Sequence, residues 1–479
     1  MNNILKLKKI TSVWIIVILL LFVFAISFGI TMRFNQGNDI NLSPITFYSL
    51  LTTHGLTMVG IWVVAGMMAV NYLLARYVKV SNGINIFALV LTVIGVLMLW
   101  LTTFVGNFHA AWTFLYPLPF YVAWAKWATP VFLLALGVLG IGWFVWSVGL
   151  LWQILKRYSL SEAFAWQHLK KEHTVETPPF VLITTVTLIG IIACLLTAVL
   201  LLILYFTEYF SKGAFTNDAL LMKNLTYFFG HTIINEALYL GVATLYELLP
   251  EVSGRPKFKM TWYVSLAWNC TLLFVLTAFF HHMYMDFAQP QSFQMIGQIA
   301  SYFASLPSAS VTAFSVIVLI YKNPIKWSLT NFLFLVGVAG WLIGGIGAVI
   351  DATITNNFVL HNTLWVPAHF HTYNAMGNVL FSLAFFNWVA QDFQNATAST
   401  RYDKQKMFWL MIGGFGFVLM FYIGGADSIP RRYAVYPDEF TKAKLLASAG
   451  AWFAIIYLWA ILVIVFNIVK RCIKVFSAS

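Results

Sequence analysis

Two segments decide what fold this chain can adopt: Trp365 to His371, which reads W-V-P-A-H-F-H, and Phe279 to His282, which reads F-F-H-H. Both lie in long apolar stretches, where an imidazole without a partner is costly to bury. Four histidines concentrated in two such tracts therefore indicate metal ligation inside an apolar helical protein.

The composition places the whole chain in a membrane. Of its 479 residues, 61% are hydrophobic, 17% aromatic and only 9% charged, which a water-soluble domain of this length would not tolerate. An α-helix needs roughly 20 apolar residues to cross a hydrocarbon core ~30 Å thick. We therefore expect an all-α bundle of about twelve transmembrane helices, forming a single domain over residues 1–479. The twelve apolar segments lie approximately at 12–31, 46–75, 84–106, 129–155, 179–207, 220–249, 260–282, 295–321, 328–350, 361–391, 407–425 and 445–469.

The basic residues predict the orientation of these helices. Lys6, Lys8 and Lys9 precede the first apolar segment, which is too long for a signal peptide and has no A-x-A cleavage site after it, so we expect a retained helix. With the amino terminus in the cytoplasm, twenty of the 28 lysines and arginines fall in inner segments. Both termini are therefore expected to be cytoplasmic. The net charge of +12 follows from this loop bias and does not predict nucleic-acid binding.

Six histidines share one depth in this topology, in the outer half of the membrane. On an α-helix each residue turns about 100°, so His369 and His371 project from nearly opposite faces, and one helix can hold two cofactors. Each histidine alone could be a hydrogen-bonded core residue or mark an interface. Together they predict a metal or haem site in the bundle core. The six are His54, His231, His281, His282, His369 and His371.

The motifs around these histidines resemble a known family over nearly the whole length of the chain. They are H-G-L-T-M at His54, W-T-F-L-Y-P-L-P at Trp112, G-H at Gly230, F-F-H-H at Phe279, L-P-S-A-S-V-T-A-F-S at Leu306, H-N-T-L-W-V-P-A-H-F-H at His361 and I-P-R-R-Y at Ile429. The chain resembles the catalytic subunit I of the haem-copper oxidase superfamily, and within it the B-type branch. The resemblance implies a prokaryotic cytoplasmic membrane and an active site toward its outer face.

The resemblance also implies two haems and a second metal ion, copper or non-haem iron. The low-spin haem takes His54 and His371 as its axial ligands, and the high-spin haem takes His369 as its proximal ligand. The second metal takes three ligands, His231, His281 and His282. Arg431 and Arg432 resemble the pair that holds haem propionates, because planar guanidinium groups bind carboxylates in a bidentate manner.

One position departs from the oxygen-reducing members of the A and B types. These members carry a tyrosine four residues after the histidine of the sixth helix, covalently joined to a ligand histidine, whereas this chain has Asn235 four residues after His231. C-type enzymes place their tyrosine about a turn before the histidine pair, but here Tyr284 lies beyond it. Tyr239 is roughly 12 Å from His231 along the helix axis, too deep for the same bond. Cleaving O₂ requires four electrons, one of them from the tyrosine, so its absence favours two-electron reduction of nitric oxide.

Polar residues near this position suggest proton transfer. Glu236 is placed deep in a helix, as the only such acidic residue, and points about 140° from His231. It is interpreted as a proton donor or relay, as a metal ligand if the helical turn widens, or as a neutral structural acid. Asn235 would hydrogen-bond a bound ligand. A row of hydroxyls resembles the B-type proton path, although helix packing by small residues also explains it. The row comprises Ser308, Thr312 and Ser315, with Tyr239 nearby.

We therefore expect a respiratory nitric oxide reductase in which electrons reach the binuclear centre through the low-spin haem. The chain has no C-x-x-x-C dicopper motif and no C-x-x-C-H haem attachment, so a second subunit, cupredoxin-like or cytochrome c-like, must pass on electrons from a soluble donor on the outer face. One alternative is a terminal oxygen reductase that has replaced or relocated its tyrosine. Another is a transporter that binds its substrate at polar residues near the midplane.

Overall fold

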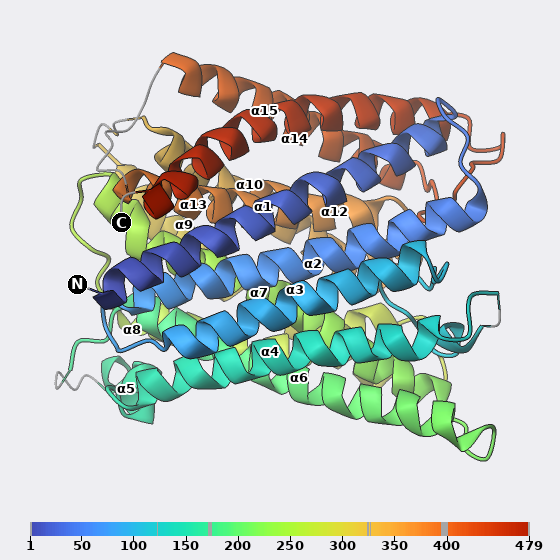
Figure 1. Ribbon diagram of the computed structural model, residues 1–479, viewed down its shortest axis with the longest axis horizontal. Coiled ribbons are helices and arrows are strands. Elements are labelled where there is room, and N and C mark those ends of the chain that lie inside the picture. The colour runs from blue at the N-terminus through green and yellow to red at the C-terminus, as the bar shows by residue number, and fades with distance from the viewer. Residues whose placement is uncertain are drawn as a thin grey trace.

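The computed structural model describes residues 2–121, 123–170, 175–322, 325, 327–393 and 401–477, and these form an elongated bundle of helices (Figure 1). Both ends of the chain lie at the same end of the bundle, as an even number of crossings requires. The long helices are α1 Asn2–Gly37, α2 Pro44–Leu74, α3 Asn82–Phe104, α4 Ala128–Leu155, α6 Pro179–Ser211, α7 Ala219–Val252, α8 Trp262–Val275, α9 Ser292–Ile320, α10 Leu329–Ala352, α13 Val379–Asp392, α14 Arg401–Ala426 and α15 Ala443–Ser477. Short elements connect them: α5 Leu160–Ala163, α11 Ile354–Leu360, α12 Trp365–Tyr373, the 3-10 turns η1 Leu118–Phe120, η2 Trp166–His168 and η3 Ala278–Met283, and the π turn η4 Asn374–Asn378.

Each of the twelve predicted apolar segments coincides with helix, which confirms the predicted fold class. Ten helices in the described part of the chain are long and apolar enough to cross a membrane. The two remaining predicted segments do not meet this criterion of length and apolar character, and the reasons differ. Helix α7 has 34 residues but carries polar side chains such as His231, Asn235 and Glu236. The segment predicted at 361–391 is divided into α12 and α13 by the π turn.

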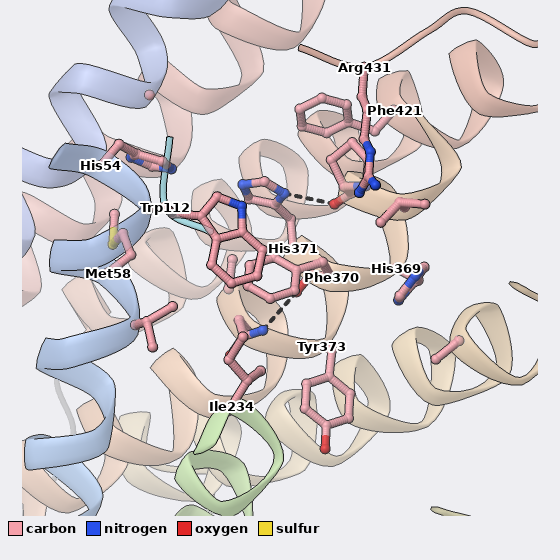
Figure 2. A pocket seen from close by; sticks show the side chains of 18 of the residues that line it. His54, Met58, Trp112, Ile234, His369, Phe370, His371, Tyr373, Phe421 and Arg431 are labelled. Atoms are coloured by element: carbon pink, nitrogen blue, oxygen red, sulfur yellow. Dashed lines mark hydrogen bonds between the residues drawn. The ribbon is translucent and has the colours of Figure 1, made fainter. Parts of the chain in front are cut away.

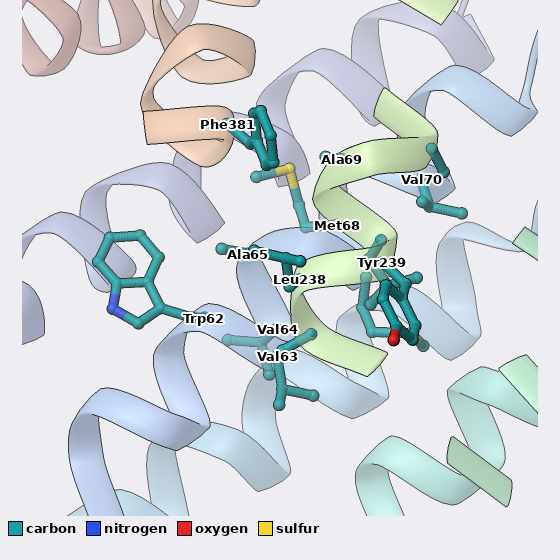
Figure 3. Close-up of a cluster of buried hydrophobic side chains, with 14 of the residues drawn as sticks. Trp62, Val63, Val64, Ala65, Met68, Ala69, Val70, Leu238, Tyr239 and Phe381 are labelled. Atoms are coloured by element: carbon teal, nitrogen blue, oxygen red, sulfur yellow. The ribbon is translucent and has the colours of Figure 1, made fainter. Parts of the chain in front are cut away.

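The helices pack into one apolar core in which α7 contacts α2, α6 and α13. Figure 3 shows Met68 of α2, Leu238 of α7 and Phe381 of α13 meeting in this core. A Cβ added at Gly66 of α2 would lie 2.6 Å from the Leu240 Cβ of α7, so the glycine allows the two backbones to approach closely. The core therefore fixes α7, which carries the first metal-binding candidate.

The π turn lies directly after the histidines of α12. A Cβ at Gly340 of α10 would lie 2.1 Å from the Met376 carbonyl oxygen, so α10 presses against this turn. Single π turns within helices occur frequently at functional sites. At the other end of α12, the Leu364 amide donates to the Ile429 carbonyl at 2.8 Å, and the Arg431 amide donates to Asn362 at 2.9 Å. The loop after α14 is thereby held against the start of α12.

Candidate haem and metal centre

Three histidines form a compact cluster of ligand atoms. His231 comes from α7, and His281 and His282 come from η3; one ligand nitrogen of each lies within 4.8 Å of the others. Adjacent residues of a regular α-helix point about 100° apart, so His281 and His282 need a local change of helix geometry to share one ion. In the structure α8 ends at Val275, and the chain continues as the tighter 3-10 turn Ala278–Met283. The three imidazoles are close enough to bind a single metal ion, and Glu236 is not part of the cluster.

Hydrogen bonds fix which nitrogen of His281 is available to a metal. The Ser301 hydroxyl donates to the Gly297 carbonyl at 2.6 Å, so its oxygen accepts from His281 Nδ1 at 3.0 Å. Nδ1 then carries the proton and Nε2 keeps its lone pair, as in metal sites where a second partner orients the ligand imidazole. The Tyr227 ring stacks on His282, with centroids 4.8 Å apart. Three neutral imidazoles of this kind fit copper or iron.

His54 of α2 and His371 of α12 form a separate pair. Their rings are nearly parallel, inclined by 19°, with centroids 6.4 Å apart. His54 Nδ1 donates to the Ala25 carbonyl and His371 Nδ1 to the Pro367 carbonyl, both at 2.7 Å. Each Nε2 is therefore left with its lone pair, so the two imidazoles would be able to hold one haem iron.

His369 projects from α12 in a different direction from His371 (Figure 2), so one helix presents its two imidazoles to different parts of the cavity. Its Nε2 lies 3.5 Å from Asp351 Oδ2, without a hydrogen bond. Asp351 is only 1% exposed, at the end of α10. The site therefore has a buried acid besides Glu236, but this acid lies at a helix end and not deep within a helix. Asp351 falls one residue beyond the predicted apolar segment, which is why the hydropathy pattern does not identify it.

Arginines surround the outer part of the site. Arg431 and Arg432 line the cavity, as the motif predicts, and no described residue accepts a hydrogen bond from Arg431 Nε. Burial, and next the Arg432 charge, lower the pKa of Arg431 to about 10. Arg33, which follows the predicted apolar segment 12–31, is instead buried in α1, and its guanidinium carbon lies 4.5 Å from the Phe421 ring centroid. Within the described residues none of these three guanidinium groups forms an ion pair with a carboxylate, so they fit carboxylate-bearing groups such as haem propionates.

One cavity of about 340 Å³ joins both histidine groups. It extends from His54 and Phe421, past Phe370 and Trp112, to Ile234 on α7 (Figure 2), and His231 of the same helix also lines it. Its lining is mostly apolar, with imidazole nitrogens and guanidinium groups at defined places. This set of donors fits two haems and one further metal ion.

Asn235 lies in this cavity beside His231, as the spacing predicts. Its Nδ2 donates to the His231 carbonyl at 2.9 Å and lies 3.5 Å from either ring nitrogen of His231. Its Oδ1 accepts a hydrogen bond of 2.9 Å from the Tyr373 hydroxyl. Tyr373 and Tyr227, both cavity-lining, are not identified by the motifs, although Tyr227 precedes His231 by one helical turn and Tyr373 follows His371 by two residues.

Glu236 points away from the metal cluster. A Cβ at Gly190 of α6 would lie 1.9 Å from Glu236 Oε1, so the carboxyl group rests against that helix. This direction agrees with the expected angle from His231, and it is not compatible with Glu236 as a metal ligand. Glu236 is close enough to Tyr239 and Tyr373 to interact electrostatically with both hydroxyls. A role as a proton relay or as a structural acid remains consistent with this position.

The predicted hydroxyl row lies between α7 and α9. Ser308 and Thr312 are fully buried, and Ser315 is half-buried on the next turn. Tyr239 donates to the Ala304 carbonyl at 3.1 Å and also interacts with the Ser308 hydroxyl. Tyr246, which the sequence analysis does not select, donates to Thr312 Oγ1 at 3.2 Å. It lies seven residues from Tyr239, on the same helical face.

Comparison with known proteins finds one family over most of the chain. The family model described as Cytochrome C and Quinol oxidase polypeptide I matches residues 9–462. Cytochrome c oxidase polypeptide 1 of Halobacterium salinarum is 27% identical over 87% of this chain and 70% of its own length. Cytochrome c oxidase subunit 1 of Thermus thermophilus is 26% identical over 52% of this chain and 48% of its own. Ubiquinol oxidase subunit 1 of Acetobacter aceti is 22% identical over 93% of this chain and 68% of its own.

The fold also has a counterpart among solved structures. A heme-copper terminal oxidase dimer, solved by cryo-EM, contains a chain that superimposes with a TM-score of 0.78. The superposition covers 97% of this chain and 84% of the other, at 23% identity. At that identity the similarity supports the architecture, and the gas that is reduced has to be argued from the site.

Proposed function

This chain belongs to the cytochrome c and quinol oxidase polypeptide I family, the subunit I of haem-copper oxidases, and on that premise we propose that it reduces nitric oxide. The reaction is 2 NO + 2 e⁻ + 2 H⁺ → N₂O + H₂O. Members of the family are oxidoreductases with two haems and a binuclear centre, which supply the electrons and the position where the gas binds. His54 and His371 would hold the low-spin haem, and His369 the high-spin haem. The remaining histidine cluster would hold copper or iron.

Asn235 is the observation that carries this proposal. It occupies the cavity beside His231, where the oxygen-reducing relatives of the A and B types are expected to have their cross-linked tyrosine. A carboxamide supplies neither an electron nor a hydrogen atom to O₂. It does supply an N–H group: one hydrogen of Asn235 Nδ2 goes to the His231 carbonyl at 2.9 Å, and its contacts with the His231 ring nitrogens are long, at 3.5 Å. The second N–H can donate to an oxygen atom of bound nitric oxide.

The apolar character of the gas agrees with a second cavity of about 410 Å³ between α4, α6 and α7. Its lipid-facing side includes the exposed side chains of Ile141 and Val199. Its inner side includes Trp112 and Tyr227, which also line the main cavity. A small apolar molecule dissolved in the bilayer would therefore find a continuous apolar surface toward the site.

Oxygen reduction is the second candidate, and the names of the relatives favour it over nitric oxide. Those relatives are cytochrome c oxidases and a ubiquinol oxidase. Tyr373 also supports it, because its hydroxyl meets Asn235 inside the cavity and so resembles a relocated tyrosine. The transporter alternative has no comparable support, because the chain belongs to a family of oxidoreductases.

The decisive experiment measures NO and O₂ consumption on one purified preparation that also contains the electron-donating subunit. The reduced-minus-oxidised spectrum should first show two haems, and metal analysis should identify copper or iron. We expect nitric oxide turnover to exceed oxygen turnover. The Asn235→Tyr variant should change that ratio toward oxygen, whereas Asn224→Tyr, on the same helix outside the cavity, should leave it unchanged. Oxygen consumption far above nitric oxide consumption in the unmodified protein would establish the second candidate.

Partners and location are proposed on the same basis. A second subunit should carry electrons from a soluble donor to the low-spin haem, because this chain has no motif for a dicopper centre or a covalent haem. The multi-pass topology, with its excess of inner lysines and arginines, supports the cytoplasmic membrane of a prokaryote and a site toward the outer face.

A further inference from the structure

Tyr373 occupies a place that neither the metal ligands nor the predicted proton path accounts for. It lies on α12, the helix that carries His369 and His371, and its ring extends away from both histidine rings (Figure 2). The side chain is buried but lines the cavity that contains His231. Its hydroxyl donates to Asn235 Oδ1 at 2.9 Å. Tyr373 therefore places a hydroxyl group inside the site, next to the position where the gas would react.

On its other side, Tyr373 reaches the buried hydroxyl row. The Tyr239 hydroxyl interacts with the hydroxyls of both Tyr373 and Ser308. Tyr239 donates its own hydrogen to the Ala304 carbonyl, and Tyr373 donates to Asn235, so each oxygen has a free lone pair. Rotation of either O–H bond lets one tyrosine donate to the other. The row that begins near Tyr246 and Thr312 thus ends at Tyr373.

Two neighbours of Tyr373, Asn235 and Glu236, cannot take over its position between the hydroxyl row and the cavity. Asn235 has no O–H and holds a proton only on its amide nitrogen, so it serves to hold the Tyr373 hydroxyl in position. Glu236 rests against Gly190 of α6 and does not line the cavity. Among the described residues of the row, Tyr373 is the one hydroxyl that lines the cavity as well as interacting with Tyr239.

We propose that Tyr373 delivers protons to the reacting gas and that Asn235 orients it. The phenol O–H bond breaks as its proton passes to a product oxygen, and the phenolate takes a proton from Tyr239, which is reprotonated through Ser308. No electron leaves the tyrosine, and two such transfers supply the two protons consumed per N₂O and water. The inference rests on the proposed function only in requiring proton-consuming gas reduction, which holds for NO and for O₂.

The test compares Tyr373→Phe with Tyr457→Phe. Tyr457 also lines the cavity, but its hydroxyl donates to the Ala375 carbonyl at 2.8 Å and interacts with no residue of the row. Both variants would be assayed with whichever gas the unmodified protein reduces, so the absence of any turnover in that protein would count against the proposed function and not against this inference. Haem content and the infrared band of bound CO should match the unmodified protein in both variants.

We expect Tyr373→Phe to lower turnover by ~10²-fold, the typical contribution of a proton-donating group. Proton uptake, followed with a pH-sensitive dye during a single turnover, should slow in parallel and show a larger solvent deuterium isotope effect, while Tyr457→Phe stays within about twofold. Unchanged proton uptake in Tyr373→Phe, or equal slowing in both variants, would overturn the proposal. Should Tyr373→Phe lose haem, Tyr239→Phe provides the second test, and it must slow proton uptake while retaining the CO band.

Discussion

The low-spin haem pair and the three-histidine cluster are held in different ways. His54 and His371 are each fixed by a 2.7 Å hydrogen bond from Nδ1 to a backbone carbonyl, and their rings face one another. In the cluster, His281 is fixed by the Ser301 hydroxyl. The His231 ring nitrogens meet only the Asn235 amide at 3.5 Å, among hydrogen-bonding groups of the described residues. The His54–His371 pair is closed, because a histidine lies on each side. The three-histidine cluster is open, because space remains beside its ligands.

This difference corresponds to two chemical tasks. A haem that only transfers electrons should keep both axial positions filled, so that its geometry does not change between oxidation states. A centre that binds and reduces a gas needs an open coordination position and polar side chains at that opening. The closed pair is held by main-chain groups that substitution cannot remove, whereas the open cluster is held by side chains that can be changed one at a time.

The strongest test removes one candidate ligand from each of the two sites. His282→Ala should lower the affinity for the second metal by more than ~100-fold, because even an outer partner of a ligand contributes 10- to 100-fold. Gas turnover should then be lost while the low-spin haem spectrum remains. His371→Ala should do the reverse and abolish the low-spin signal. Metal analysis and haem spectra of both variants check this, and loss of both signals in either variant would show that the two sites do not form independently.

The second-largest effect on metal affinity is expected at Ser301, the hydrogen-bond partner of the candidate ligand His281. Ser301→Ala removes the acceptor of the His281 Nδ1 hydrogen and should lower the affinity for the second metal by about 10- to 100-fold. Competition with a chelator measures this affinity. Ser305→Ala is the matched control, since Ser305 lines the same cavity one turn further along α9 but its hydroxyl makes no hydrogen bond with the three described histidines of the cluster. Equal metal retention in both variants would mean that Ser301 does not orient the ligand.

A smaller effect is expected at Glu236. Its carboxyl group lies against Gly190, outside the cavity, but interacts with Tyr239 and Tyr373. Glu236→Gln should therefore slow proton-coupled turnover by less than the ~10²-fold expected for a group that transfers the proton itself. Haem content should stay the same. Turnover rates across pH, compared with those of Tyr373→Phe, measure the difference, and a larger loss in Glu236→Gln would reverse the assigned order of the two residues.

The sequence predicts the helices and selects six histidines that do line one cavity, but it misses several of the residues around them. Apolar length determines a helix in a membrane, and the spacing in H-F-H determines that two rings point apart. Asp351 and Tyr373 enter the site because α10 presses against the π turn at Asn374–Asn378, which involves contacts between distant segments. Arg33 is read as a loop residue because α1 extends to Gly37, beyond the predicted end at 31. Local patterns do not contain these contacts.

The smallest expected effect is a loss of stability at Gly190 and Glu236, which lie outside the cavity where the gas would bind. Gly190→Ala introduces a Cβ that would lie 1.9 Å from Glu236 Oε1, so the carboxyl group or α6 must move. Overpacking of this kind typically costs about 1–3 kcal/mol, and thermal unfolding of the purified protein should show the loss. Shortening the acid in the double variant Gly190→Ala with Glu236→Ala removes the clash, so the two changes should be less than additive. If the displaced carboxyl group also changes turnover, Glu236 acts through its position beside the tyrosines; if only stability falls, the acid is structural, and proton transfer belongs to the tyrosines alone.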